Sequence, residues 1–182
     1  MRLHLGSAGD RKPGHFGIDM IEDPDTVDMV WDLNKVPWPW ERDSIESIFA
    51  DNVLEHLCPL GKSQAQLNIP AVMSEIHRVL QPGGTVEIIV PSTDGRGAWQ
   101  DPTHVTYWNR NTFLYYIKGE MNFMAHNLAG YPQFITNRRD LGVTDVDRPE
   151  SGIVFTVARL MKPLEEEPDG LGATEGSDFK DD

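Results

Sequence analysis

Three aspartates in the first third of the chain have the chemistry to hold a ribose, because a carboxylate accepts hydrogen bonds from both ribose hydroxyls or from an adenine amine. They are Asp19, Asp32 and Asp51. Each ends an apolar stretch that is typical of a β-strand, and these predicted strands span 15–20, 28–33 and 44–51. Parallel strands bring their carboxyl ends to one edge of a sheet, so we expect the three carboxylates to line that edge. Taken singly, each aspartate could equally be a helix cap or a loop acid.

A glycine turn precedes the first of these acids. The predicted strand 3–6 ends at Gly6, and only a few residues, up to about Pro13, separate it from the next strand. A crossover between parallel neighbours normally takes about a dozen residues and contains a helix, which Pro13 and Gly14 disfavour here. The pattern suits a ligand with a ribose and a close backbone contact. It does not suit a pyrophosphate, which needs a glycine-rich loop opening a helix. An ordinary tight turn between core strands is the structural alternative.

Two further pairs combine a histidine with a carboxylate: Glu55 with His56, and Asp101 with His104. Adjacent residues on a short helix point in different directions, so we interpret His56 as part of a site wall and not as a catalytic group. Asp101 and His104 are the candidate catalytic residues, with His104 as a base that takes a proton from an acceptor oxygen or nitrogen. The alternative is that this pair only holds a lid in place. No Cys/His cluster has metal-ligand spacing, so the sequence predicts no metal site.

The remaining sequence predicts the helix and strands that position these candidate residues. A helix is predicted over 70–80, with apolar residues at helical spacing, and Gln81-Pro82-Gly83-Gly84 ends it. Further strands are predicted at 85–90, 134–135 and 152–160. Strands alternating with crossovers predict an α/β fold with a parallel sheet, whose ligand site lies beyond the carboxyl ends of the strands.

Length, charge and cysteine content limit the classes of function that this chain can have. The 182 residues suit one domain, and the formal net charge is −13. The tail 164–182 carries eight of the 29 acidic residues and one of the 16 basic ones, so disorder is expected there and the domain is expected to span 1–163. The remainder is still acidic, which disfavours direct nucleic-acid binding. Cys58 is the only cysteine, and no apolar stretch is long enough for a signal or a membrane span. We therefore expect a soluble, cytoplasmic protein.

Five segments together resemble the class I S-adenosylmethionine-dependent methyltransferases: LHLGSA, GIDM, DLNKVPWPW, SIESIFADNVLEHL and EIHRVLQPGGTVEIIVP. The resemblance runs from about residue 3 to residue 116 and is strongest to a compact branch whose first helix is cut to a turn. It implies a Rossmann-like, doubly wound, mostly parallel sheet of seven-stranded type, with the first helix reduced or missing. It also implies S-adenosylmethionine as the cofactor.

The resemblance also implies roles for individual residues. The glycine turn would contact the methionine part of the cofactor, Asp19 the ribose, and Asp32 with its neighbour the adenine. The implied cofactor-binding residues are Gly6, Ser7, Ala8, Asp19, Met20, Asp32, Leu33 and Asn52. Ala8 is a departure, because the family usually has glycine there.

The aromatic segment 92–133 leaves the fifth predicted strand at the site edge, and we expect it to form a lid or the acceptor side of the pocket. The expected activity is methyl transfer to a small-molecule or glycan-type acceptor, without membrane association. Two alternatives stay open. One is a non-catalytic interaction module that keeps the fold, which Ala8 and the missing helix motivate. The other is a different transferase on the same fold, such as an aminopropyl transferase. The sequence predicts neither the acceptor nor the oligomeric state.

Overall fold

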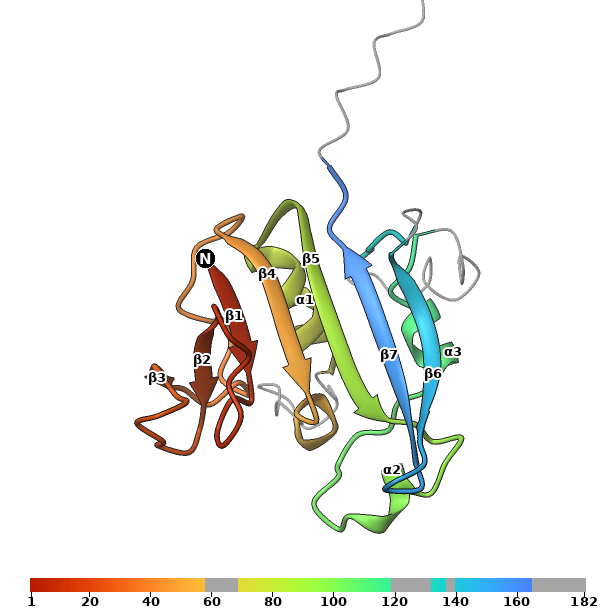
Figure 1. Ribbon diagram of the computed structural model, residues 1–182. Coiled ribbons are helices and arrows are strands. Elements are labelled where there is room, and N and C mark those ends of the chain that lie inside the picture. The colour runs from red at the N-terminus through yellow and green to blue at the C-terminus, as the bar shows by residue number, and fades with distance from the viewer. Residues whose placement is uncertain (58–68, 119–131, 137–139, 165–182) are drawn as a thin grey trace, which may run out of the picture.

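One seven-stranded sheet runs through the computed structural model, which describes residues 1–57, 69–118, 132–136 and 140–164. Its strands lie in the order β3-β2-β1-β4-β5-β7-β6 (Figure 1). They are β1 Arg2–Leu5, β2 Phe16–Asp19, β3 Met29–Val30, β4 Ile45–Asp51, β5 Leu80–Pro91, β6 Gly142–Arg148 and β7 Ile153–Met161. The pairs among β3, β2, β1, β4 and β5 are parallel, whereas β7 is antiparallel to both of its neighbours. The predicted α/β, mostly parallel, seven-stranded sheet is confirmed.

The connection between β1 and β2 is a turn and contains no helix. Gly6 begins it with a φ of +72°, and the backbone N–H groups of Gly6 and Ser7 both donate to the carbonyl of Ile18, at 2.8 and 3.2 Å. These two hydrogen bonds attach the turn directly to β2. This confirms the prediction that the first helix is missing.

Helix α1, Ile69–Val79, covers one face of the sheet, seen behind β4 and β5 in Figure 1. Its apolar stripe of Val72, Met73, Ile76 and Val79 is fully buried. Burial of each such side chain stabilises the fold by about 1.5–3 kcal/mol, which offsets the conformational entropy that the helix loses. The helix begins and ends within one residue of the predicted 70–80.

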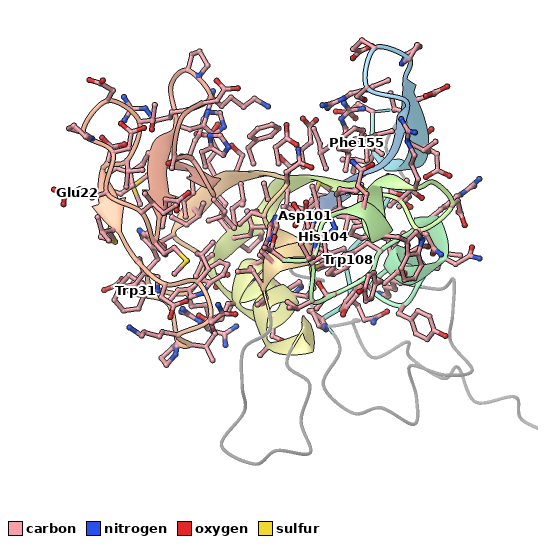
Figure 2. The ribbon with its side chains drawn as sticks, turned by 90° about the horizontal axis from the view of Figure 1, so that it is seen from below. Glu22, Trp31, Asp101, His104, Trp108 and Phe155 are labelled. Atoms are coloured by element: carbon pink, nitrogen blue, oxygen red, sulfur yellow. The ribbon has the colours of Figure 1, made fainter. Side chains whose placement is uncertain are left out.

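Short helical segments and a group of aromatic side chains complete the fold. The segments are the 3₁₀ turn η1 Leu54–His56, α2 Gly97–Gln100 and α3 Arg110–Leu114. Trp108 and Phe113 stack with ring centroids 5.0 Å apart inside the main core, whereas Phe155 belongs to a smaller cluster. Figure 2, a view from below, shows Trp108 and Phe155 on opposite sides of the sheet. In the described part of the protein, no helix has the length and apolarity that crossing a membrane requires.

In the C-terminal half, one strand prediction was wrong and one strand was missed. Phe134 and Ile135 form only isolated bridges, with Ile117 and Met161, and the last pair of strands is instead β6 and β7. β6 lies at the sheet edge and most of its side chains are exposed, so it carries no apolar signal and is held by its backbone pairing with β7.

Two other strands, β3 and β5, differ from their predicted bounds by more than one residue. β3 spans only Met29–Val30 and not 28–33, because the chain leaves the pairing after the N–H of Trp31 bonds to the Asp19 carbonyl at 2.8 Å. β5 begins at Leu80 and runs through the glycine turn, which lies in an irregularity of the pairing with β4 between Ile45 and Ser47. The predicted strand 85–90 is the regular part of β5.

Candidate cofactor and acceptor site

A cavity of about 310 Å³ opens at the carboxyl ends of β1, β2 and β4. Seven of the eight residues to which the resemblance assigns cofactor contacts line it: Gly6, Ala8, Asp19, Met20, Asp32, Leu33 and Asn52. His56 lines it too, as expected of a wall residue. The fold therefore brings Asp19, at the end of β2, and Asp32, just beyond β3, to one cavity. Asp51, the third such acid, is not among its lining residues.

The floor of the cavity requires glycine at position 6. A Cβ atom on Gly6 would lie 2.7 Å from the Cβ of Val53, and the positive φ disfavours any side chain there. Ser7, the eighth of the implied cofactor-binding residues, has a buried side chain, and its hydroxyl donates to the Thr26 carbonyl at 2.9 Å. Ser7 thus stabilises the turn and its side chain does not face the cavity.

Asp19 is held in place before any ligand binds. One carboxylate oxygen accepts from the N–H of Ala8 at 3.1 Å, and the other accepts from the N–H of Ile21 at 3.0 Å. A carboxylate offers about four lone-pair directions, so acceptor capacity remains toward the cavity. The glycine turn and the acid are therefore one hydrogen-bonded unit, with Ala8 contributing its backbone to it.

The opposite wall combines a second acid with apolar surface. Asp32 accepts from the N–H of Asn34 at 3.0 Å, and Leu33 is buried beside it. Asn52 has a φ of +50° and donates its side-chain N–H to Asp51 at 2.8 Å. Sequence reasoning missed four apolar lining residues, each next to a predicted one or within a few residues of it: Ile21, Trp31, Val53 and Leu57.

A second group of polar residues adjoins the cavity at His56. The N–H groups of Val105 and Thr106 both donate to the carbonyl of Glu55, at 2.9 and 3.0 Å, and dock the loop after α2 on η1. This brings His104 to His56, with ring centroids 4.9 Å apart. Asp101 Oδ2 lies 3.8 Å from His104 Nε2, and Figure 2 shows both side chains near the middle of the view. The predicted pair Asp101 and His104 thus lies beside Glu55 and His56.

The carboxylates of this group differ in surroundings. Glu55 is 2% exposed, and neither carboxylate oxygen has a hydrogen-bond partner among the described residues. Burial raises the pKa of Glu55 to about 7, helped by the charges of Asp51 and Asp101. By contrast, the hydroxyl and N–H of Thr103 hold the pKa of Asp101 below its ordinary value. We therefore expect Asp101 to be ionised at neutral pH and Glu55 to be close to half-protonated.

Part of the aromatic segment 92–133 can be placed. Trp99 and Tyr107 stack at 4.6 Å between centroids and are largely exposed. Residues 119–131 lie outside the described residues, as do Cys58 and most of the predicted tail, so the lid and tail predictions stay predictions. His77 lies on α1 with its ring 5.1 Å from that of Phe134, a structural position.

A second hollow, of about 440 Å³, lies over β4, β5 and β7. Most of its charged side chains are paired: Arg159 with Glu87 at 2.6 Å, Lys12 with Glu87 at 3.5 Å, and Arg2 with Glu46 at 2.7 Å. It lies away from the carboxyl ends of the parallel strands. We therefore place the candidate site in the smaller cavity.

Comparison with solved structures gives the fold. The chain resembles the 1,6-didemethyltoxoflavin-N1-methyltransferase of Burkholderia thailandensis, solved with S-adenosylhomocysteine, with a TM-score of 0.57 and 16% identity over 89% of this chain and 70% of that one. A SAM-dependent methyltransferase from Archaeoglobus fulgidus gives 0.56 and 12%, over 88% and 85%. Phosphoethanolamine N-methyltransferase 2 of Haemonchus contortus, solved with S-adenosyl-L-methionine, gives 0.52 and 13%, over 90% of this chain and 48% of that one.

No family model and no curated protein sequence matches the chain. At such low identities the structural likeness defines the fold, and this is the fold of the S-adenosylmethionine-dependent methyltransferases.

Proposed function

We propose that this chain binds S-adenosylmethionine and transfers its methyl group to a small-molecule or glycan-type acceptor. The observation that carries the proposal is that a glycine turn and two acids, Asp19 at the end of β2 and Asp32 just beyond β3, line one cavity of a methyltransferase-type sheet. The structural neighbours that were solved with S-adenosylhomocysteine or S-adenosylmethionine support the choice of cofactor.

The residues present fit that cofactor. The missing Cβ of Gly6 lets the turn pack against Val53, so that Gly6 presents only backbone atoms to the cavity. The polar edge of the cavity carries the oriented carboxylate of Asp19 for the ribose hydroxyls. Asp32 and Leu33, with the exposed Met20, supply one acceptor and two apolar surfaces for the adenine. This division of polar and apolar walls matches a nucleoside.

The cofactor, when bound, supplies an electrophilic methyl group on a sulfonium. The protein's part in such an in-line displacement is to position the acceptor and to remove its proton. The acceptor's oxygen or nitrogen forms the new bond to carbon, the sulfur–carbon bond breaks, and the acceptor's proton leaves to a base or to water. His56 lines the cavity with Glu55 and His104 clustered beside it, and this cluster supplies the candidate base.

Isothermal titration of the full-length protein with S-adenosylmethionine and S-adenosylhomocysteine tests the proposal. We expect both to bind, and Asp19→Ala to weaken both by roughly ten- to a hundred-fold, because a charge-assisted hydrogen bond to a buried ribose is worth about 1.5–3 kcal/mol. Asp25→Ala, which removes an exposed acid outside the cavity, is the matched control. Absence of binding heat and of a thermal shift at millimolar cofactor would favour the interaction module instead.

A further inference from the structure

Glu55, His56 and His104 form a compact cluster of side chains that can ligate a metal ion. One ligand atom of each residue lies within 4.8 Å of one ligand atom of each of the others. The sequence predicts no metal site, because no Cys/His cluster has metal-ligand spacing. The three come together through the bonds of Val105 and Thr106 to the Glu55 carbonyl.

The hydrogen bonds of the two imidazoles fix which nitrogen is available. His104 Nδ1 lies 3.0 Å from the carbonyl of Ala98. His56 Nδ1 lies 3.3 Å from the carbonyl of Thr103 and 3.2 Å from its hydroxyl, which accepts here because it donates its own proton to Asp101 at 2.6 Å. A carbonyl only accepts, so in each neutral ring Nδ1 carries the proton and Nε2 keeps its lone pair. This is the arrangement of metal-binding histidines, whose second nitrogen is oriented by a backbone carbonyl.

Glu55 adds a carboxylate that the protein leaves without a donor. Both of its oxygens are buried and lack a hydrogen-bond partner among the described residues, although buried carboxylates are normally paired or bound to metal. Beside the two imidazoles, this carboxylate needs either a cation or a proton of its own to be satisfied.

We propose that Glu55, His56 and His104 form a binding site for one divalent transition-metal ion. Two imidazoles and one carboxylate suit Zn²⁺ and its first-row neighbours, whereas Mg²⁺ and Ca²⁺ prefer oxygen ligands. Ligands of one tetrahedral ion at about 2.0–2.1 Å lie about 3.4 Å apart, so binding draws the side chains together by roughly 1 Å. The exposed ring of His56 has the freedom to make that movement.

Three protein ligands leave a coordination position open, as in catalytic metal sites. His56 also lines the cavity, so that position would face the acceptor side. This part of the inference rests on the proposed function: the ion would bind the acceptor's oxygen or nitrogen beside the methyl group and lower the pKa of that atom's proton.

Titration of the untagged, chelator-treated, full-length protein with Zn²⁺ alone tests the site, with Co²⁺ absorption as a second readout. We expect one ion per molecule, and at least tenfold weaker binding in both Glu55→Gln and His104→Asn. His104→Asn keeps a donor for the Ala98 carbonyl and removes only the second nitrogen. His15→Asn, which changes an imidazole outside the cluster, should bind as the wild type does. Zn²⁺ should raise the melting temperature of the wild type and of this control, but not of the two cluster variants.

No binding by the wild type, or equal binding by Glu55→Gln and His104→Asn, would overturn the site and leave Glu55 protonated against the imidazoles. If His104→Asn does not fold, Glu55→Gln, which is nearly isosteric, decides alone. The metal titration contains no S-adenosylmethionine and the cofactor titration contains no metal. Zn²⁺ binding without cofactor binding thus refutes only the proposed function, and the reverse refutes only the metal site.

Discussion

Asp19 and Glu55 are carboxylates at the same edge of one sheet, and their surroundings are opposite. Asp19 is half-buried and accepts from two backbone N–H groups, at 3.1 and 3.0 Å. Glu55 is 2% exposed and accepts from none in the described structure. The first is satisfied before a ligand arrives, whereas the second is left to a proton or a cation.

The two sides of the candidate site are therefore built differently. The cofactor side, around Gly6 and Asp19, is formed within a short stretch of sequence, in which the glycine turn hydrogen-bonds to the acid that ends the next strand. The acceptor side, around Glu55, His56 and His104, depends on a contact between distant segments and contains an unpaired carboxylate, which destabilises the fold. Such a cost is typical of sites at which a group must change its protonation or ligand state.

We expect the largest difference between the two sides from a substitution of His104. His104→Ala should lower turnover by 10²-fold or more and leave S-adenosylmethionine affinity unchanged, because His104 lies in the acceptor-side group and does not line the cavity. Screening acceptors with labelled cofactor supplies the assay, and cofactor titration supplies the control.

Two results would contradict that division. A fall of only several-fold, the loss expected for one hydrogen bond of about 1 kcal/mol, would make His104 a support of the loop. Loss of cofactor binding would instead place His104 in the cofactor site.

We expect the second-largest effect on the pH dependence of the free energy of unfolding, through Glu55. Its pKa in the folded protein is about 7, above the ordinary 4.5, so the folded state holds this proton more tightly than the unfolded state does. The stability that this proton contributes is fully present below about pH 4.5 and is lost as pH rises toward 7, by about 3 kcal/mol at most.

Glu55→Gln removes that titration. We expect chelator-treated Glu55→Gln to exceed the wild type in stability at pH 8 and to lack the decline between pH 4.5 and 7, as measured by urea unfolding across this range. If the free energy of unfolding depends on pH in the same way in the two proteins, burial does not raise the pKa of Glu55.

The two sides also differ in how far the sequence could predict them. The parallel strands, the missing first helix and the acids Asp19 and Asp32 follow from local patterns, because alternation, glycine and strand ends are visible in a short window. The inward side chain of Ser7 could not be foreseen, since it depends on the carbonyl of Thr26 across the turn.

The acceptor side was less predictable, because its key contacts join η1 to a loop about fifty residues further on. The pattern indicated Asp101 and His104 as candidates but separated Glu55 from His56, on the ground that neighbours on a short helix diverge. The structure instead brings a third residue, His104, to both of them. β6 escaped prediction for a related reason, since an exposed edge strand depends on its partner and not on its own apolar residues.

The smallest effect is expected from the C-terminal tail. Deleting Leu164–Asp182 should leave both the melting temperature and the cofactor affinity unchanged, because this stretch has few apolar residues to bury and eight acidic ones. Thermal melts and cofactor titrations at low and high salt measure both quantities. A full-length variant with the tail acids changed to Asn and Gln separates packing from charge. A drop of several degrees on deletion, but not on neutralisation, would mean that the tail docks through its apolar residues and that the domain does not end at 163.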